Sequence, residues 1–117
     1  MPVTVAETRA FLARKAEHHS ALAARRTTAL RAKLPEAAAL LRAEFGADEV
    51  WSFGSLAWGK PQLVSDVDIA VSSIASGKYF RALSVLSDLF EADVDLVEFS
   101  VIDDGFAERI RAQGTRL

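Results

Sequence analysis

The stretch FGSLAWGKPQLVSDVDIAV, residues 53–71, contains a Gly-Ser pair and, eleven residues after the serine, two aspartates separated by one valine. These aspartates, Asp66 and Asp68, sit in a run of Val, Ile and Ala that is typical of a β-strand. Alternate strand residues face the same side, so both carboxylates are expected on one face, about 6.6 Å apart along the strand. Burying a carboxylate in an apolar strand is energetically unfavourable, so the two aspartates are candidates for a functional site.

Helices and strands are expected to alternate around this stretch. Helical spacing without breakers predicts a long, basic, amphipathic helix over residues 4–33, and Pro35 opens a second helix that Gly46 ends. Apolar patterns then indicate two strands, a helix, a strand and a last helix capped by Asp103, over residues 49–53, 65–72, 78–90, 92–99 and 102–110. This order predicts an α/β (α+β) fold in which helices flank a small mixed sheet.

One domain is expected over residues 1–117, with a helical extension over residues 1–46 and a catalytic core over residues 47–117. Half of the residues are apolar, which is enough for one core without disulfides or structural metal. In the third helix, the apolar face is expected to contain Phe80, Leu83, Leu86 and Phe90.

The composition excludes several classes of protein. No cysteine is present, so a disulfide framework, a thiol nucleophile and Cys-ligated zinc are excluded. Arginines interrupt the first thirty residues, which therefore lack the apolar core of a signal peptide, and no segment is long enough to span a bilayer. We therefore expect a cytoplasmic protein without membrane contact.

Charge is distributed unevenly along the chain. Residues 1–46 contain eight basic and four acidic residues, a net +4, whereas residues 47–117 contain six basic and twelve acidic residues, a net −6. The acidic half includes the Asp-Val-Asp motif. Bare carboxylates repel a polyphosphate, so phosphate chemistry there would need divalent cations.

A short link joins the first two expected strands, which are therefore predicted to be antiparallel and to bring Gly54 and Ser55 near Asp66 and Asp68. Glycine lets the backbone approach a ligand closely, and the turn after it can donate backbone and hydroxyl hydrogens to phosphate. Asp95, in the next strand, closes the site if that strand lies beside the second, and Asp93 points the same way. Three carboxylates and an anion-binding turn indicate two-metal phosphoryl or nucleotidyl transfer.

Over residues 48–99, the chain resembles the minimal nucleotidyltransferase family of the DNA polymerase β superfamily. The segments that carry this resemblance are, in chain order, GSLAWG, SDVDIAV and VDLVEF. The resemblance implies the palm-like fold of that superfamily, with the nucleoside triphosphate on Gly54 and Ser55. It also implies two Mg²⁺ ions on Asp66 and Asp68, completed by Asp95, which orients or deprotonates the acceptor hydroxyl. The family has an arginine where this sequence has Trp58, and Lys60 is the candidate substitute.

Small members of this family typically act as antitoxins paired with a helical HEPN-type ribonuclease toxin. The resemblance therefore implies transfer of AMP from ATP to a hydroxyl of such a partner, because the chain has little with which to build an acceptor site of its own. Two alternatives stay open: a catalytically silent module that neutralises its partner by docking, and a transferase for a small hydroxylated molecule. A homo-oligomer is also open, and nucleic acid is the less favoured partner of the basic first helix.

Other conspicuous side chains have plainer interpretations. His18 and His19 lie far from the motif in sequence and are expected to be exposed or packing residues. Trp51 and Trp58 are expected to pack rather than to stack on a base.

Overall fold

The computed structural model describes residues 4–57 and 66–117. The predictions made for Trp58 and Lys60 lie outside the described residues. Within the part described, the order of elements is two helices, a strand, a short 3-10 turn, a strand, a helix, a strand, a helix and a final strand. None of the described helices is apolar over a length sufficient to cross a membrane.

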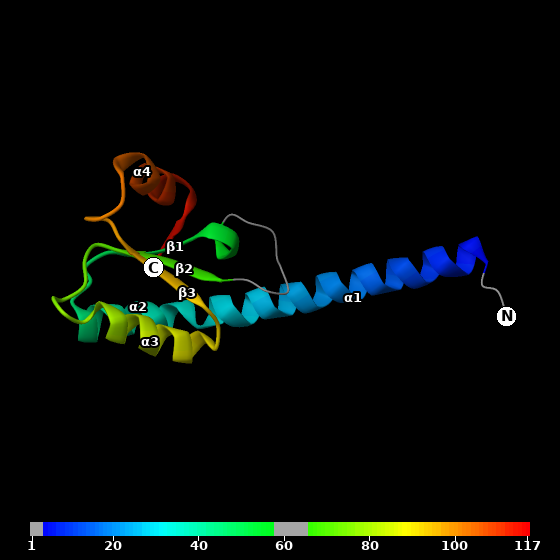
Figure 1. The fold of residues 1–117 in the computed structure, drawn as a ribbon, viewed down its shortest axis with the longest axis horizontal. Helices are drawn as coiled ribbons and strands as arrows, with labels where there is room; N and C mark the ends of the chain where they lie inside the picture. The colour runs from blue at the N-terminus through cyan, green and yellow to red at the C-terminus, as the bar shows by residue number, and fades with distance from the viewer. Residues whose placement is uncertain (1–3, 58–65) are drawn as a thin grey trace.

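A sheet in the order β3-β2-β1-β4 forms the centre of the domain (Figure 1). Its strands are β1 Val50–Phe53, β2 Val67–Val71, β3 Val94–Glu98 and β4 Thr115–Arg116. β1 and β2 are antiparallel, whereas β2 and β3 are parallel because a helix connects them. The predicted mixed sheet with flanking helices is confirmed. The sequence did not reveal β4, whose two residues are too few for a visible alternation.

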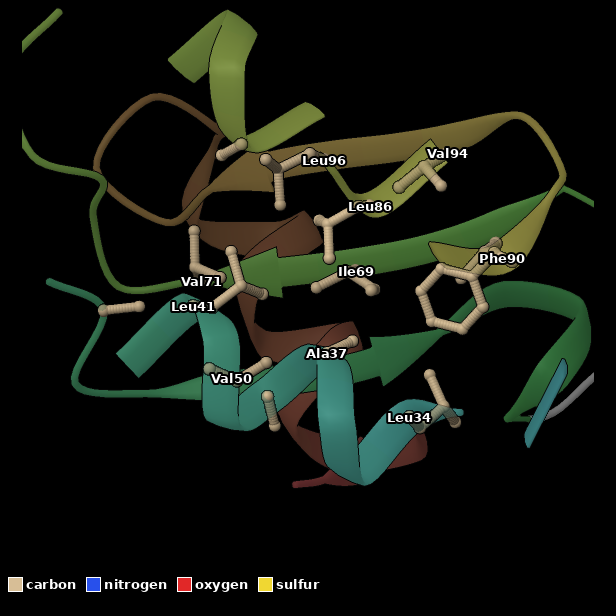
Figure 2. Packing of buried hydrophobic residues seen from close by; sticks show 14 of the residues in the cluster. Leu34, Ala37, Leu41, Val50, Ile69, Val71, Leu86, Phe90, Val94 and Leu96 are labelled. Carbon is tan, nitrogen blue, oxygen red and sulfur yellow. The ribbon is translucent and has the colours of Figure 1, made fainter. Parts of the chain in front are cut away.

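Two helices, α2 Leu34–Phe45 and α3 Tyr79–Phe90, cover one face of the sheet (Figure 1). Figure 2 shows the resulting core, where side chains from both helices meet those of the strands. Its largest fully buried members include Leu41, Ile69 and Phe90. Gly46 ends α2, as predicted, and the structure shows it in the left-handed conformation with φ 74°.

The last helix, α4 Asp104–Gln113, lies on the opposite face (Figure 1). The Asp103 carboxylate accepts a hydrogen bond from the Phe106 backbone N–H at 2.8 Å, so the predicted cap is present. Ile110 packs against Phe53 and Ala70 in a second, smaller cluster of buried residues. α4 thus covers only part of this face.

The predicted buried face of α3 is wrong at one position. Ala82, Leu86 and Phe90 recur every four residues and form the buried stripe, but the Phe80 side chain is 80% exposed. Each helical residue turns the side chain by about 100°, so Phe80, two residues before Ala82, lies outside that stripe.

The first helix, α1 Val5–Ala32, begins with a capping box made by Thr4 and Glu7 and extends well beyond the rest of the domain (Figure 1). Its buried residues are Ala23, Thr27 and Leu30, all near its end. Earlier apolar side chains are exposed, namely Val5, Phe11, Leu12 and Leu22. The apolar face expected from the sequence is therefore covered only over the last turns.

Candidate active site

A row of paired backbone positions crosses three strands where β1 ends and β2 and β3 begin. Asp68 pairs with Phe53 of β1 on one side and with Asp95 of β3 on the other. Adjacent strands lie about 4.8 Å apart, so the two carboxylates project side by side from the same face. Two residues further along their strands, Ala70 and Val97 belong to the smaller cluster around Ile110 of α4, which we call the α4 cluster. The carboxylates therefore lie on the α4 side of the sheet, just beyond that cluster.

The Asp68 carboxyl has unusual electrostatics for a surface acid. Its burial, a hydrogen bond shared with the Asp95 carboxyl and the charges of Asp95 and Asp66 together raise the pKa of Asp68 to about 7. Asp68 is half-buried, whereas Asp66 and Asp95 are exposed. Carboxylates this close resist ionising together unless a counter-charge lies between them.

A divalent cation bound by oxygen is a suitable counter-charge for this pair. Within residues 4–57 and 66–117, no group of three or more acidic or histidine side chains is close enough together to bind a metal ion without further ligands. Mg²⁺ is commonly held by one or two carboxylates together with substrate phosphates and water. The Asp68 and Asp95 carboxylates fit that mode of binding, in which a nucleotide completes the ligand set.

Gly54 brings the backbone of the Gly-Ser turn directly against Asp68. The turn is η1 Gly54–Leu56, and Gly54 has a positive φ of 69°. A Cβ atom built on Gly54 would lie 2.1 Å from the Asp68 carboxylate oxygen Oδ2, much closer than any real contact. Only glycine therefore allows this approach, and Ser55 follows it in the turn.

A family model described as polymerase beta, nucleotidyltransferase matches residues 37–117, more than half of the chain. The chain belongs to this family. The resemblance of the Gly-Ser and Asp-Val-Asp motifs to nucleotidyltransferases is thereby confirmed, and α1 lies before the matched residues.

Several solved structures share this fold. A protein described as a minimal nucleotidyltransferase is 25% identical, with a TM-score of 0.66 over 78% of this chain and 95% of that one. A toxin–antitoxin solved with AMP-PNP is 26% identical, with a TM-score of 0.59 over 67% of this chain and 66% of that one. The toxin–antitoxin MntA-HepT is 21% identical, with a TM-score of 0.57 over 74% of this chain and 69% of that one. At this identity, the likeness supports a shared fold and nothing further. No curated protein matches the chain.

The nucleotidyltransferase domain brings the predicted acidic residues together to different degrees. Asp68 and Asp95 are paired across β2 and β3, and both Asp95 and Asp66, directly before β2, help to raise the pKa of Asp68. Asp93, the rival of Asp95, is exposed, and its carbonyl oxygen accepts a hydrogen bond from the Val67 N–H at 2.9 Å. The geometry thus associates Asp95, rather than Asp93, with Asp68.

Two other side chains singled out in the sequence, Trp51 and His18, have the plain structural roles expected of them. The Trp51 indole N–H donates to Glu49 Oε1 at 2.6 Å, and its ring packs against the α4 cluster, as expected of a packing residue. His18 is exposed on α1.

One contact beside the turn was missed by sequence reasoning. Arg31 Nε in α1 donates to the Leu56 carbonyl oxygen at 2.8 Å. The two residues are 25 positions apart, and no local pattern links them.

Proposed function

We propose that this nucleotidyltransferase moves a nucleoside monophosphate, with AMP from ATP as the first candidate, to a hydroxyl of a partner protein. The acceptor oxygen forms a bond to the α-phosphorus, the bond from that phosphorus to the bridging oxygen breaks, and pyrophosphate leaves. The observation that carries the proposal is the contact of Gly54 with Asp68, itself paired with Asp95, in a domain of this family.

Each residue has a role that suits its surroundings. Gly54 and Ser55 would hold the triphosphate beside the carboxylates. Asp95 is exposed and can reach an acceptor hydroxyl, whose proton it would accept. Asp66, Asp68 and Asp95 would hold Mg²⁺, which when bound neutralises phosphate charge and polarises the phosphorus–oxygen bonds.

The partner we propose is a helical HEPN-type toxin, with this chain as its antitoxin. Support comes from family membership and from a fold shared with toxin–antitoxin proteins, one of them solved with AMP-PNP. The acceptor hydroxyl is then on the toxin.

Labelled ATP tests the reaction directly. The chain is co-expressed with a small helical protein encoded next to it, purified, and incubated with Mg²⁺ and ATP labelled at either the α- or the γ-phosphate. We expect α-label on the partner, a mass increase of one AMP, and no transfer of γ-label. Transfer of γ-label would indicate phosphorylation and overturn the proposal. Absence of both labels, in a complex that forms, would favour the silent docking module.

The silent module draws its support from Trp58, which occupies the position of an arginine in the family. Indole cannot supply the positive charge that stabilises phosphate oxygens during transfer. Losing such a contact costs about a hundredfold in rate. We therefore expect slow transfer by the wild type and transfer up to about a hundredfold faster by Trp58→Arg, measured as initial rates at saturating ATP and partner. A well-folded Trp58→Arg variant that is no faster would show that Trp58 does not replace a lost phosphate ligand.

The exposed part of α1 is proposed to supply part of the partner or self-association interface. α1 carries six basic and two acidic residues, and burial begins only at Ala23. Deleting residues 1–22 should therefore abolish complex formation in light scattering after size exclusion, while leaving the melting temperature of the core and AMP-PNP binding unchanged.

Two point variants test the same interface without shortening the chain, one on α1 and one on α3 as its control. Phe11 and Phe80 are both exposed, one on α1 and the other on α3. Phe11→Ser should weaken the complex and Phe80→Ser should not. Equal complexes from all these proteins would remove α1 from the interface.

A further inference from the structure

The Gly54–Ser55 turn is a single 3-10 turn whose far end is tied to α1. Within it, the Ala57 N–H donates to the Gly54 carbonyl oxygen at 3.1 Å. The Leu56 side chain is buried in the main core, with 3% exposed, and anchors the turn from below. The Leu56 carbonyl accepts the Arg31 Nε–H at 2.8 Å, a hydrogen bond that the guanidinium charge strengthens.

Packing of α1 keeps Arg31 in place. Its neighbour Leu30 is 3% exposed and belongs to the same core cluster as Leu56. This burial fixes the last turn of α1, so Arg31 reaches the turn from a rigid base. The backbone N–H groups of a helical turn point toward its start and the carbonyls toward its end. Arg31 therefore holds the carbonyl end of the turn, opposite the Gly54–Ser55 end.

We propose that Arg31 is a positioning residue for nucleotide binding, which acts through the Leu56 carbonyl on the Gly54–Ser55 turn. This inference rests on the proposed function of that turn. It makes the last turn of α1 part of the nucleotide-binding apparatus, although the contact joins positions 25 residues apart. Without Arg31, the turn keeps its buried leucine but loses the hydrogen bond that sets its orientation.

Three variants separate positioning from charge and packing. Arg31→Met removes the donor but keeps an unbranched apolar stem, and Arg31→Lys restores a donor. Arg25→Met removes the same charge from an exposed position of the same helix. We measure binding of AMP-PNP with Mg²⁺ by calorimetry, the melting temperature, and the amide ¹H–¹⁵N shifts of Gly54 and Ser55 without nucleotide. Should Arg31→Met fail to fold, Arg31→Gln replaces it.

We expect Arg31→Met to weaken AMP-PNP binding about tenfold, Arg31→Lys to recover most of that loss, and Arg25→Met to bind like the wild type. The Gly54 and Ser55 amide shifts should move in Arg31→Met even without nucleotide, which distinguishes positioning from direct contact with phosphate. Wild-type binding by folded Arg31→Met, or equal weakening by Arg25→Met, would overturn the inference. If the wild type binds no AMP-PNP, the proposed function fails, and unchanged nucleotide-free shifts in Arg31→Met would overturn the positioning role separately.

Discussion

Replacing Asp68 with asparagine is expected to lower nucleotide transfer at least about a hundredfold while leaving the domain folded. Asp68 is paired with Asp95 and touches the turn at Gly54, so its carboxylate lies at the centre of the proposed site. A neutral amide of the same shape is not an anionic ligand and cannot hold Mg²⁺ as a carboxylate does. The measurement is the initial rate of AMP transfer to the partner at saturating ATP and Mg²⁺.

The same substitution is expected to stabilise the metal-free protein. Because the pKa of Asp68 is raised to about 7, the folded state binds its proton more tightly than the unfolded state, whose pKa is near 3.8. The free energy of unfolding therefore falls as the pH rises from about 4 to about 7, and Asp68→Asn avoids this loss. Allowing for solvent screening of a half-exposed group, we expect a gain on the order of 1 kcal/mol above pH 7. At pH 4 the two proteins should melt alike.

Comparison with three further variants sharpens the result. Asp88→Asn changes an exposed carboxylate on α3, away from the sheet face that carries Asp68, and should leave both rate and melting temperature unchanged. Asp95→Asn should lose transfer, whereas Asp93→Asn should retain it if Asp95 is the third carboxylate. Transfer by Asp68→Asn at the wild-type rate would refute the site.

Mg²⁺ should raise the melting temperature of the wild type but not of Asp68→Asn.

Replacing Gly54 with alanine is expected to have an effect of similar size for a steric reason. The new Cβ would lie 2.1 Å from Asp68 Oδ2, so either the carboxylate or the turn must move. A displacement of about 1 Å in a catalytic group costs on the order of a hundredfold in rate. We therefore expect Gly54→Ala to lose at least about a hundredfold in transfer and to weaken AMP-PNP binding.

Gly77→Ala is the matched control, because it carries the backbone strain without the collision. Gly77 has φ 76°, close to the 69° of Gly54, but a Cβ there meets nothing within 4 Å. Both substitutions put alanine in the left-handed region, at a cost of about 1–2 kcal/mol in folding stability. Equal losses of transfer in the two variants would assign the effect to backbone strain and remove the Gly54 contact from the mechanism.

Much of the local structure follows from the sequence. Helix ends are marked by short-range chemistry, and Gly46 and Asp103 end and begin their helices as predicted. Strand alternation predicted Asp66 and Asp68 on one face, and the structure has Asp68 in β2 with Asp66 directly before the strand. The short link between β1 and β2 predicted their antiparallel pairing, which brings Gly54 to Asp68. These features depend on backbone geometry over a few residues.

The sequence by itself thus determined the helices, the first three strands, the mixed sheet and the meeting of the Gly54 turn with Asp68. Only the tertiary structure decided the parallel register that sets Asp68 beside Asp95, the pairing of β4, the exposure of Phe80 and the bond from Arg31 to Leu56. The physical reason is the separation in sequence of the groups that interact. Periodicity reports which side of an element is apolar, whereas these contacts depend on how far each element extends over its neighbours and which distant groups then meet.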